Sequence, residues 1–161
     1  MRKIKSFRLF ESNERLEMRI KEISDLYEDV KSLEYILEEG DYDFSFRISN
    51  QHNSYNINDN ISDLIRDNSF SGDGTSRRWR NRVFHHDFLK PVTICINILG
   101  IGGKLFNEIN STTIDKVKVD MSRFKTLLEQ HLDYLPDDSI KLFCEKSGTG
   151  WIGNYKINIS I

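Results

Sequence analysis

Residues 12–40 form the stretch that most limits what this chain can fold into. Its apolar residues recur at the spacing of one face of an α-helix, and no glycine or proline interrupts them before the last position. The stripe consists of Leu16, Ile20, Ile23, Leu26, Tyr27, Val30, Leu33, Ile36 and Leu37. A stripe this broad predicts a long helix packed against a sheet or other helices, and the alternative is a helix that also pairs with another chain.

The expected ends of this helix carry recognisable capping residues. Ser12 or Asn13 can accept a hydrogen bond from the first free backbone amides, and Glu14 and Glu17 lie where the helix dipole favours acidic side chains. Gly40 can adopt the left-handed conformation that often ends a helix. The exposed face is strongly acidic, because residues 11–43 contain twelve acids and four bases.

The rest of the chain predicts short strands and further helices. In chain order these are a strand over 42–48, a short strand over 55–57, a brief helix after Asp59 or Asn60, a strand over 91–99, a strand over 112–119, a helix from Asp120 or Ser122 to Pro136, and a closing hairpin over 140–144 and 155–161. Clean alternation in the first and last strands indicates one buried and one solvated face.

This series predicts an α+β protein with an antiparallel sheet covered on one face by two main helices. An αββαββ order is a circular shift of the ferredoxin-like βαββαβ order, so a permuted ferredoxin-like arrangement is the expected topology. The 161 residues are expected to form a single domain, with a mobile basic loop around 67–90.

The sequence also indicates the cellular compartment in which the protein is expected. No run approaches the length of a membrane-spanning helix, and the basic start lacks the apolar run of a signal peptide, which predicts a soluble intracellular protein with no membrane partner. Cys95 and Cys144 lie in apolar, strand-like runs without metal spacing. Both are expected to be buried, free thiols in a reducing compartment.

The segment most suggestive of function surrounds an indole with guanidinium groups. It contains Arg77, Arg78, Trp79, Arg80 and Arg82. Arginines can neutralise phosphates while the indole stacks on a base, which favours nucleic-acid binding. Binding to an acidic protein partner, or pairing with the acidic face of the first helix, would use the same charges.

His85 and His86 follow this segment and are included among the candidate binding residues. Neighbouring residues of a strand point to opposite faces, so the pair is not expected to converge on one metal ion. No catalytic or nucleotide-binding motif with its required spacing occurs in the chain. The sequence therefore predicts a binding protein with no cofactor, no metal and no enzymatic activity.

Three segments resemble small accessory proteins of tailed bacteriophages: residues 4–12 (IKSFRLFES), 37–44 (LEEGDYDF) and 155–161 (YKINISI). The chain also contains no alanine, which indicates codon bias in an AT-rich genome rather than a folding preference. The resemblance implies a phage product acting in the host cytoplasm or in the virion. The expected partner is a host or phage protein, with nucleic acid as the alternative.

Overall fold

The computed structural model describes residues 2–51, 53–58, 60–69, 87–89, 91–146 and 152–161, with side chains from residue 14 onward except those of residues 69 and 87. Its elements are α1 (Arg2–Lys31), α2 (Glu34–Glu39), β1 (Tyr42–Ser49), β2 (Ser54–Asn56), α3 (Ile61–Ser69), the 3-10 helix η2 (Asp87–Leu89), β3 (Thr93–Ile101), β4 (Lys104–Leu105), the 3-10 helix η3 (Phe106–Glu108), α4 (Ser111–His131), β5 (Ile140–Lys146) and β6 (Ile152–Ser160).

The strands form one antiparallel sheet in the order β2-β1-β3-β6-β5, and the short β4 pairs with β3. Phe46 of β1 lies opposite Ile96 of β3, which in turn lies opposite Ile157 of β6. These side chains share one face, because residues directly opposite each other in a ladder point the same way. This face carries the core of the protein.

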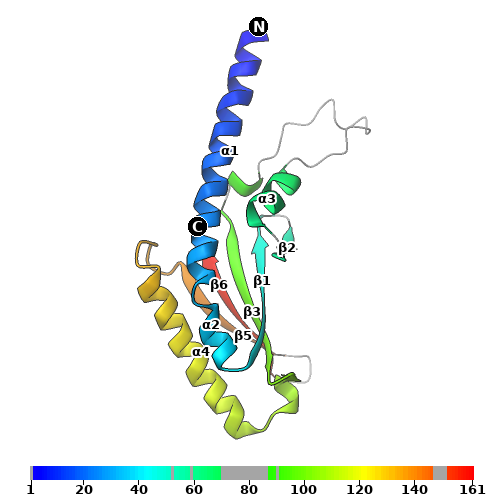
Figure 1. Ribbon diagram of the computed structural model, residues 1–161, viewed down its shortest axis with the longest axis vertical. Helices are drawn as coiled ribbons and strands as arrows, with labels where there is room; N and C mark the ends of the chain where they lie inside the picture. The colour runs from blue at the N-terminus through cyan, green and yellow to red at the C-terminus, as the bar shows by residue number, and fades with distance from the viewer. Residues whose placement is uncertain (1, 52, 59, 70–86, 90, 147–151) are drawn as a thin grey trace, which may run out of the picture.

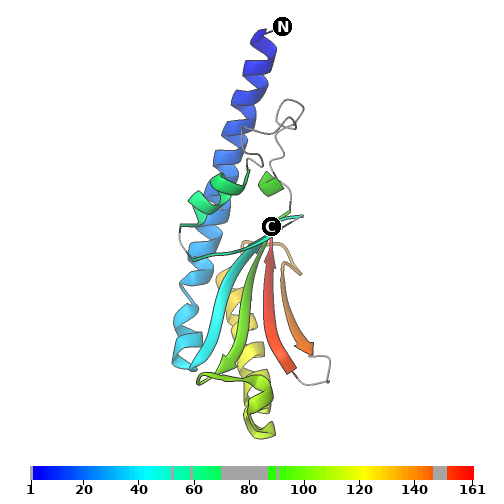
Figure 2. The same cartoon turned by 90° about the vertical axis from the view of Figure 1, so that its right-hand side faces the viewer.

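The described helices cover that face of the sheet. Figure 1 shows α1, α2 and α4 on one side of the strands, and Figure 2 shows the other face with no described helix across it. The N-terminal part of α1 continues well beyond the end of the sheet (Figure 1). The α+β class, with an antiparallel sheet covered on one face by helices, is as the sequence predicts.

The order of the long strands fits the permuted topology. Moving β6 to the front of the chain gives β6-α1-β1-β3-α4-β5, which is the βαββαβ order of the ferredoxin-like arrangement. The segment containing β2, α3 and η2 is an insertion between β1 and β3. Asn60 caps α3 by accepting a hydrogen bond from the Ser62 amide at 2.8 Å, which confirms one of the two expected caps.

The expected first helix is confirmed in its buried stripe but not in its ends. Leu16, Ile23 and Val30 are almost completely buried. The helix begins at Arg2, so neither Ser12 nor Asn13 is its cap. Capping residues are tolerated inside a helix when nothing forces the backbone to leave it, and residues 2–11 contain no glycine or proline.

The helix is also interrupted near its C-terminal end. Ser32 and Leu33 separate α1 from α2, and the Leu33 amide donates to the Val30 carbonyl at 3.1 Å, a tighter turn than that of an α-helix. Gly40 then has φ −79°, and Asp41 takes the positive φ of 58° expected of the glycine.

The strand expected over 112–119 is wrong, because this segment is the first half of α4. The cap is Asn110, whose Oδ1 accepts a hydrogen bond from the Thr113 amide at 2.9 Å, rather than Asp120 or Ser122. Val117, Met121 and Phe124 are buried at helical spacing, so a single apolar stripe runs through both halves of the helix.

The two cysteines differ in burial. Cys95 is buried on β3, as expected, whereas Cys144 is exposed on β5, contrary to the prediction. The difference follows from the sheet order, because β3 is an interior strand and β5 lies at the edge. Of the loop expected around 67–90, residues 70–86 and 90 lie outside the described residues. Within the described part, η2 anchors this region through the fully buried Phe88.

Candidate functional site

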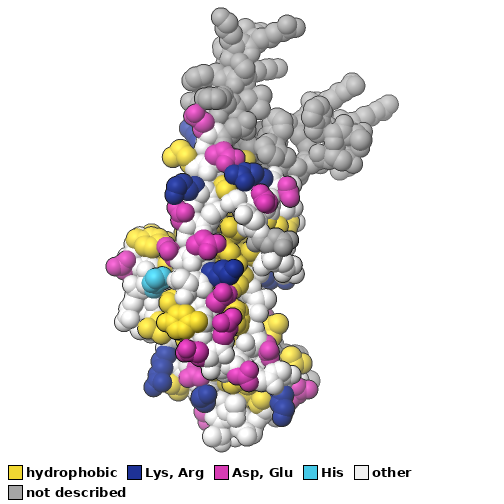
Figure 3. Space-filling model, in the orientation of Figure 1, with side chains coloured by type: hydrophobic (Ala, Val, Ile, Leu, Met, Phe, Trp, Pro, Cys, Tyr) yellow, Lys and Arg dark blue, Asp and Glu magenta, His cyan; other side chains and the backbone are white. Residues whose placement is uncertain are grey.

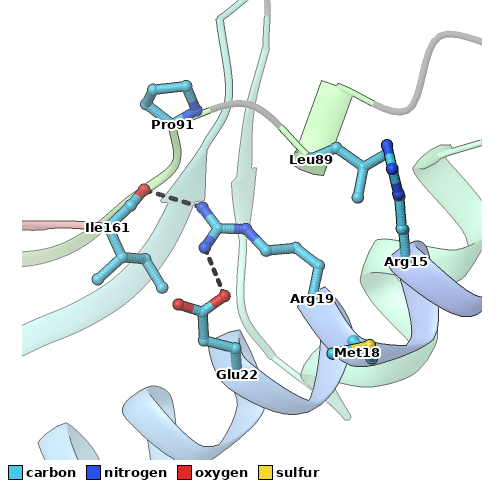
Figure 4. Close-up of a pocket in the computed structure, with 7 residues that line it drawn as sticks. All are labelled: Arg15, Met18, Arg19, Glu22, Leu89, Pro91 and Ile161. Atoms are coloured by element: carbon cyan, nitrogen blue, oxygen red, sulfur yellow. Dashed lines mark hydrogen bonds and ion pairs between the residues drawn. The ribbon is translucent and has the colours of Figure 1, made fainter.

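A hollow in the described part of the chain lies where α1 passes the end of the sheet. Arg15, Met18, Arg19 and Glu22 line one side, and their spacing places them on a single helix face. The other side consists of Leu89 from η2, Pro91 before β3, and Ile161 after β6. Figure 4 shows these residues converging from separate segments. The hollow has a volume of about 690 Å³ and is mostly apolar.

Arg19 fastens these segments together. Its Nε donates to the carbonyl of Phe88 at 3.0 Å, and one terminal nitrogen donates to the carbonyl of Ile161 at 2.9 Å. The other terminal nitrogen donates to Glu22 at 2.7 Å (Figure 4). The side chain is only 14% exposed. A planar guanidinium suits this role because its donors diverge in a fixed fork.

Met18 and Leu89 supply the exposed apolar surface of the hollow. Met18 on α1 is 74% exposed, and Leu89 is 37% exposed. Both side chains are turned away from the core that α1 covers. A methionine side chain adapts its shape to a partner at low cost, so it suits a binding surface better than a rigid core.

A second hollow continues the first along the molecule. The two share Glu22, Pro91 and Ile161, and the second extends to Tyr134, Leu135 and Pro136 after α4. We refer to the combined depression as the α1 groove.

Tyr134 ties the far end of the α1 groove to α1. Its hydroxyl donates to Asp29 at 2.7 Å. Burial, followed by this hydrogen bond, raises the pKa of Tyr134 above its ordinary value.

The surface around the α1 groove is acidic. From residue 14 to residue 39, α1 and α2 carry nine acidic and four basic side chains. Figure 3 shows acidic side chains spread over this face. Some are paired: Arg66 donates to Glu17 at 2.9 Å and so lowers the pKa of that carboxyl, and Lys21 binds Asp25 at 2.6 Å. The remaining acids leave the face with a net negative charge.

The open face of the sheet has the opposite character. Arg47, Lys141 and Lys156 lie on it, and Lys156 pairs with Glu145 at 2.5 Å. Between the longer side chains, the buried Cys95 donates weakly to Asn97 at 3.6 Å. Burial is the main reason that the pKa of the Cys95 thiol is raised.

The structure does not describe the site residues that the sequence predicts. Arg77, Arg78, Trp79, Arg80, Arg82, His85 and His86 all lie outside the described residues. The nucleic-acid and acidic-partner hypotheses for this segment therefore stay predictions.

The α1 groove was not predicted from the sequence. Its members are too far apart for a local pattern, since Arg19 and Ile161 are 142 positions apart. One available signal was Met18, an apolar residue outside the main stripe of a helix whose other face is charged.

Within the described ranges, no three His, Cys, Asp or Glu side chains cluster closely enough to hold a metal ion. None of the described helices combines the length and the apolar character needed to cross a membrane. Comparison with models of protein families, with curated proteins and with solved structures found no match to the chain.

Proposed function

We propose that this chain is a non-catalytic binding protein and that a segment of a partner protein occupies the α1 groove. The observation that carries this proposal is the exposed apolar surface of Met18 and Leu89 within a continuous groove. Exposed apolar residues are common singly, but their grouping in a concave surface favours binding.

The chemistry of the surface selects the kind of partner. An apolar groove set in an acidic surface favours a segment that combines apolar side chains with lysine or arginine, such as a basic amphipathic helix. Its apolar residues would fill the groove, and its basic residues would face the acids of α1 and α2. The resemblance to phage accessory proteins makes a host or phage protein the expected source, in the host cytoplasm or in the virion.

The contribution of Met18 to the affinity for the partner can be estimated. Burying a methionine side chain contributes about 1.5–3 kcal/mol, which corresponds to roughly a tenfold to hundredfold change in affinity. Replacing Met18 by glutamate removes this contribution and places a charge in the contact. Because Met18 is 74% exposed in the free protein, the substitution should leave the fold intact.

The test compares three baits in host lysate: wild type, Met18→Glu, and the control Val119→Glu. Val119 is 50% exposed on α4, away from the groove, so its variant carries the same charge change elsewhere. Any protein retained by wild type is identified and purified, and its Kd for each bait is measured by calorimetry in low and physiological salt.

The expected result is a stoichiometric complex that Met18→Glu weakens at least tenfold and Val119→Glu leaves unchanged. Binding should also weaken with salt, because opposite charges face each other. Equal affinity of both variants, or no salt dependence, would refute the proposed site.

Nucleic-acid binding is the second candidate, and the basic open face of the sheet favours it. Arg47 and Lys156 lie there on β1 and β6, on either side of β3, and the segment containing Arg77, Arg78, Trp79, Arg80 and Arg82 adds positive charge to the chain. Single-stranded DNA and RNA should then bind with an affinity that falls steeply as salt rises. Alanine variants of Arg47 and Lys156, and separately of the four arginines, would assign the contacts. No binding by wild type at low salt would exclude this function.

A further inference from the structure

In the described part of the chain, one edge of the sheet is uncovered. β5 is the last strand in the sheet order, and no described strand or helix lies beyond its outer edge (Figure 2). An uncovered edge presents unpaired backbone donors and acceptors, to which another strand can bind.

The hydrogen bonds of β6 show which backbone groups of β5 are free. The Ser160 amide donates to the Ser139 carbonyl at 2.9 Å, which places odd-numbered residues of β5 in the hydrogen-bonded pairs with β6. On its other side, β6 bonds through odd-numbered residues, since Ile161 and Val92 exchange both bonds. The outward backbone groups of β5 therefore belong to its even-numbered residues, among them Leu142 and Cys144.

The side chains of β5 alternate in a pattern that is symmetric about Phe143. Lys141, Phe143 and Glu145 lie on the open face of the sheet, with the base and the acid two positions from the aromatic residue on either side. All of them are exposed, and Phe143 is 44% exposed. Antiparallel pairing of this segment with itself would place unlike charges opposite each other.

We propose that β5 is a dimerisation edge, where a second copy of this chain adds its own β5 in antiparallel orientation with Phe143 opposite Phe143. Lys141 of each copy then lies opposite Glu145 of the other, and Leu142 lies opposite Cys144. The outward backbone groups of Leu142 and Cys144 meet across the interface and bond. The two sheets become one continuous sheet related by a twofold axis, which closes the assembly at two copies.

Other registers of the two β5 strands are less favourable than this one. A shift of one residue sets the outward backbone groups of one copy against the inward groups of the other. A shift of two residues places Lys141 opposite Phe143 and loses both charge pairs. In the proposed register, Phe143, Lys141 and Glu145 occupy non-hydrogen-bonded pairs, where facing Cα atoms are only about 4.5 Å apart and side chains contact most closely. The charge pairs thus select one register.

Glu145 can bind Lys156 of its own chain and Lys141 of the second copy at the same time. It already binds Lys156 of its own strand pair at 2.5 Å, and its side chain remains 48% exposed. A carboxylate has two oxygens and several acceptor directions, so a lysine of the second copy can bind without displacing Lys156.

Charge exchange tests this interface directly. The dimerisation Kd is measured by sedimentation equilibrium for wild type, Lys141→Glu, Glu145→Lys, the double variant, and an equimolar mixture of the two single variants. Each single variant places like charges opposite each other twice, so its Kd should rise by about tenfold or more. The double variant exchanges both partners and should dimerise as wild type does.

The mixture gives the most specific outcome. One variant then carries acids at both positions and the other carries bases, so they should form a heterodimer although neither dimerises with itself. Because both chains must be folded to do so, this result also excludes unfolding as the cause of the single-variant effects.

A register-specific cross-link is the second measurement. In a Cys144→Ser background, Phe143→Cys should form an intermolecular disulfide on oxidation, because a Cα separation of about 4.5 Å lies within the disulfide range. Val119→Cys in the same background is the matched control and should not form one. A wild type that is still monomeric at about 1 mM, or a dimer that Lys141→Glu leaves unchanged, would overturn the proposal. Met18→Glu lies in the α1 groove and should dimerise normally, so failure of one proposal does not imply failure of the other.

Discussion

Replacing Arg19 by methionine removes the hydrogen bonds that fasten α1 to the end of the sheet. Methionine keeps an unbranched apolar stem of similar reach but has no donor. The carbonyl of Phe88 loses the donor that lies 3.0 Å away. The carbonyl of Ile161 keeps a second donor, the Val92 amide at 2.9 Å, so it is not left unsatisfied. The loss of local stability should therefore be greatest at η2.

The decrease in stability caused by Arg19→Met can be estimated from these contacts. A hydrogen bond to a charged group contributes about 1.5–3 kcal/mol when partly buried, and the exposed ion pair with Glu22 adds less than about 1 kcal/mol. Because the Ile161 carbonyl remains bonded, we expect the free energy of unfolding to fall by about 2–3 kcal/mol. In a domain with a total stability of about 5–15 kcal/mol this is a large change.

Arg15→Met is the matched control. Arg15 lines the same groove but is exposed, and its replacement should change stability by less than about 0.5 kcal/mol. Urea unfolding gives the free energies, and hydrogen exchange should show faster exchange at Leu89 in the Arg19 variant alone. If the two variants are equally stable, or if Leu89 exchanges at the wild-type rate, the role of Arg19 as the fastening residue is wrong.

Further substitutions test the packing that positions the groove. Tyr42 donates to Asp120 at 2.6 Å, and burial together with this bond raises the pKa of Tyr42. Tyr42→Phe should cost about 1–2 kcal/mol at pH 8. The pKa of Tyr42 is higher in the folded state than in the unfolded state. The extra stability of wild type over Tyr42→Phe should therefore decrease as pH rises above about 10, where the unfolded tyrosine ionises. A difference in urea midpoint between the two proteins that stays constant to pH 11 would contradict this. Gly40→Ala places a Cβ 2.6 Å from the Tyr42 ring and should destabilise by about 1–3 kcal/mol, whereas Asp41→Gly, at φ 58°, should be neutral or stabilising. Phe124→Ala, at a position only 2% exposed, should cost about 3–5 kcal/mol in thermal or urea unfolding.

The parts of the fold that the sequence predicts well are those with long, regular patterns. The stripe of α1 spans many turns, so its type survives an error of ten residues in its start. The alternating strands β1 and β6 also kept their predicted faces, with Phe46 and Ile157 in the core. Each pattern extends over enough residues for the buried face to be unambiguous.

Predictions from short patterns were wrong where tertiary packing determined the secondary structure. Ile114, Val117 and Val119 are β-branched residues with a local preference for strand, which is why 112–119 was predicted as one. In the structure Val117 is buried and Val119 is 50% exposed, as expected for residues two apart on a helix rather than on one face of a strand. The stripe that continues to Leu128 stabilises a single helix, and this outweighs the local preference.

The candidate sites show a similar division. The arginines near Trp79 are conspicuous in sequence because all four lie between positions 77 and 82, whereas the α1 groove combines residues from both ends of the chain. The edge at β5 lies between these cases. Its charges and its aromatic residue lie within five positions of one another, but Lys141, Phe143 and Glu145 suggest a symmetric interface only once β5 is known to be the outermost strand. On an interior strand the same alternation would simply be the solvated face of a hairpin, so the proposed function of this segment depends on sheet order, which local sequence does not determine.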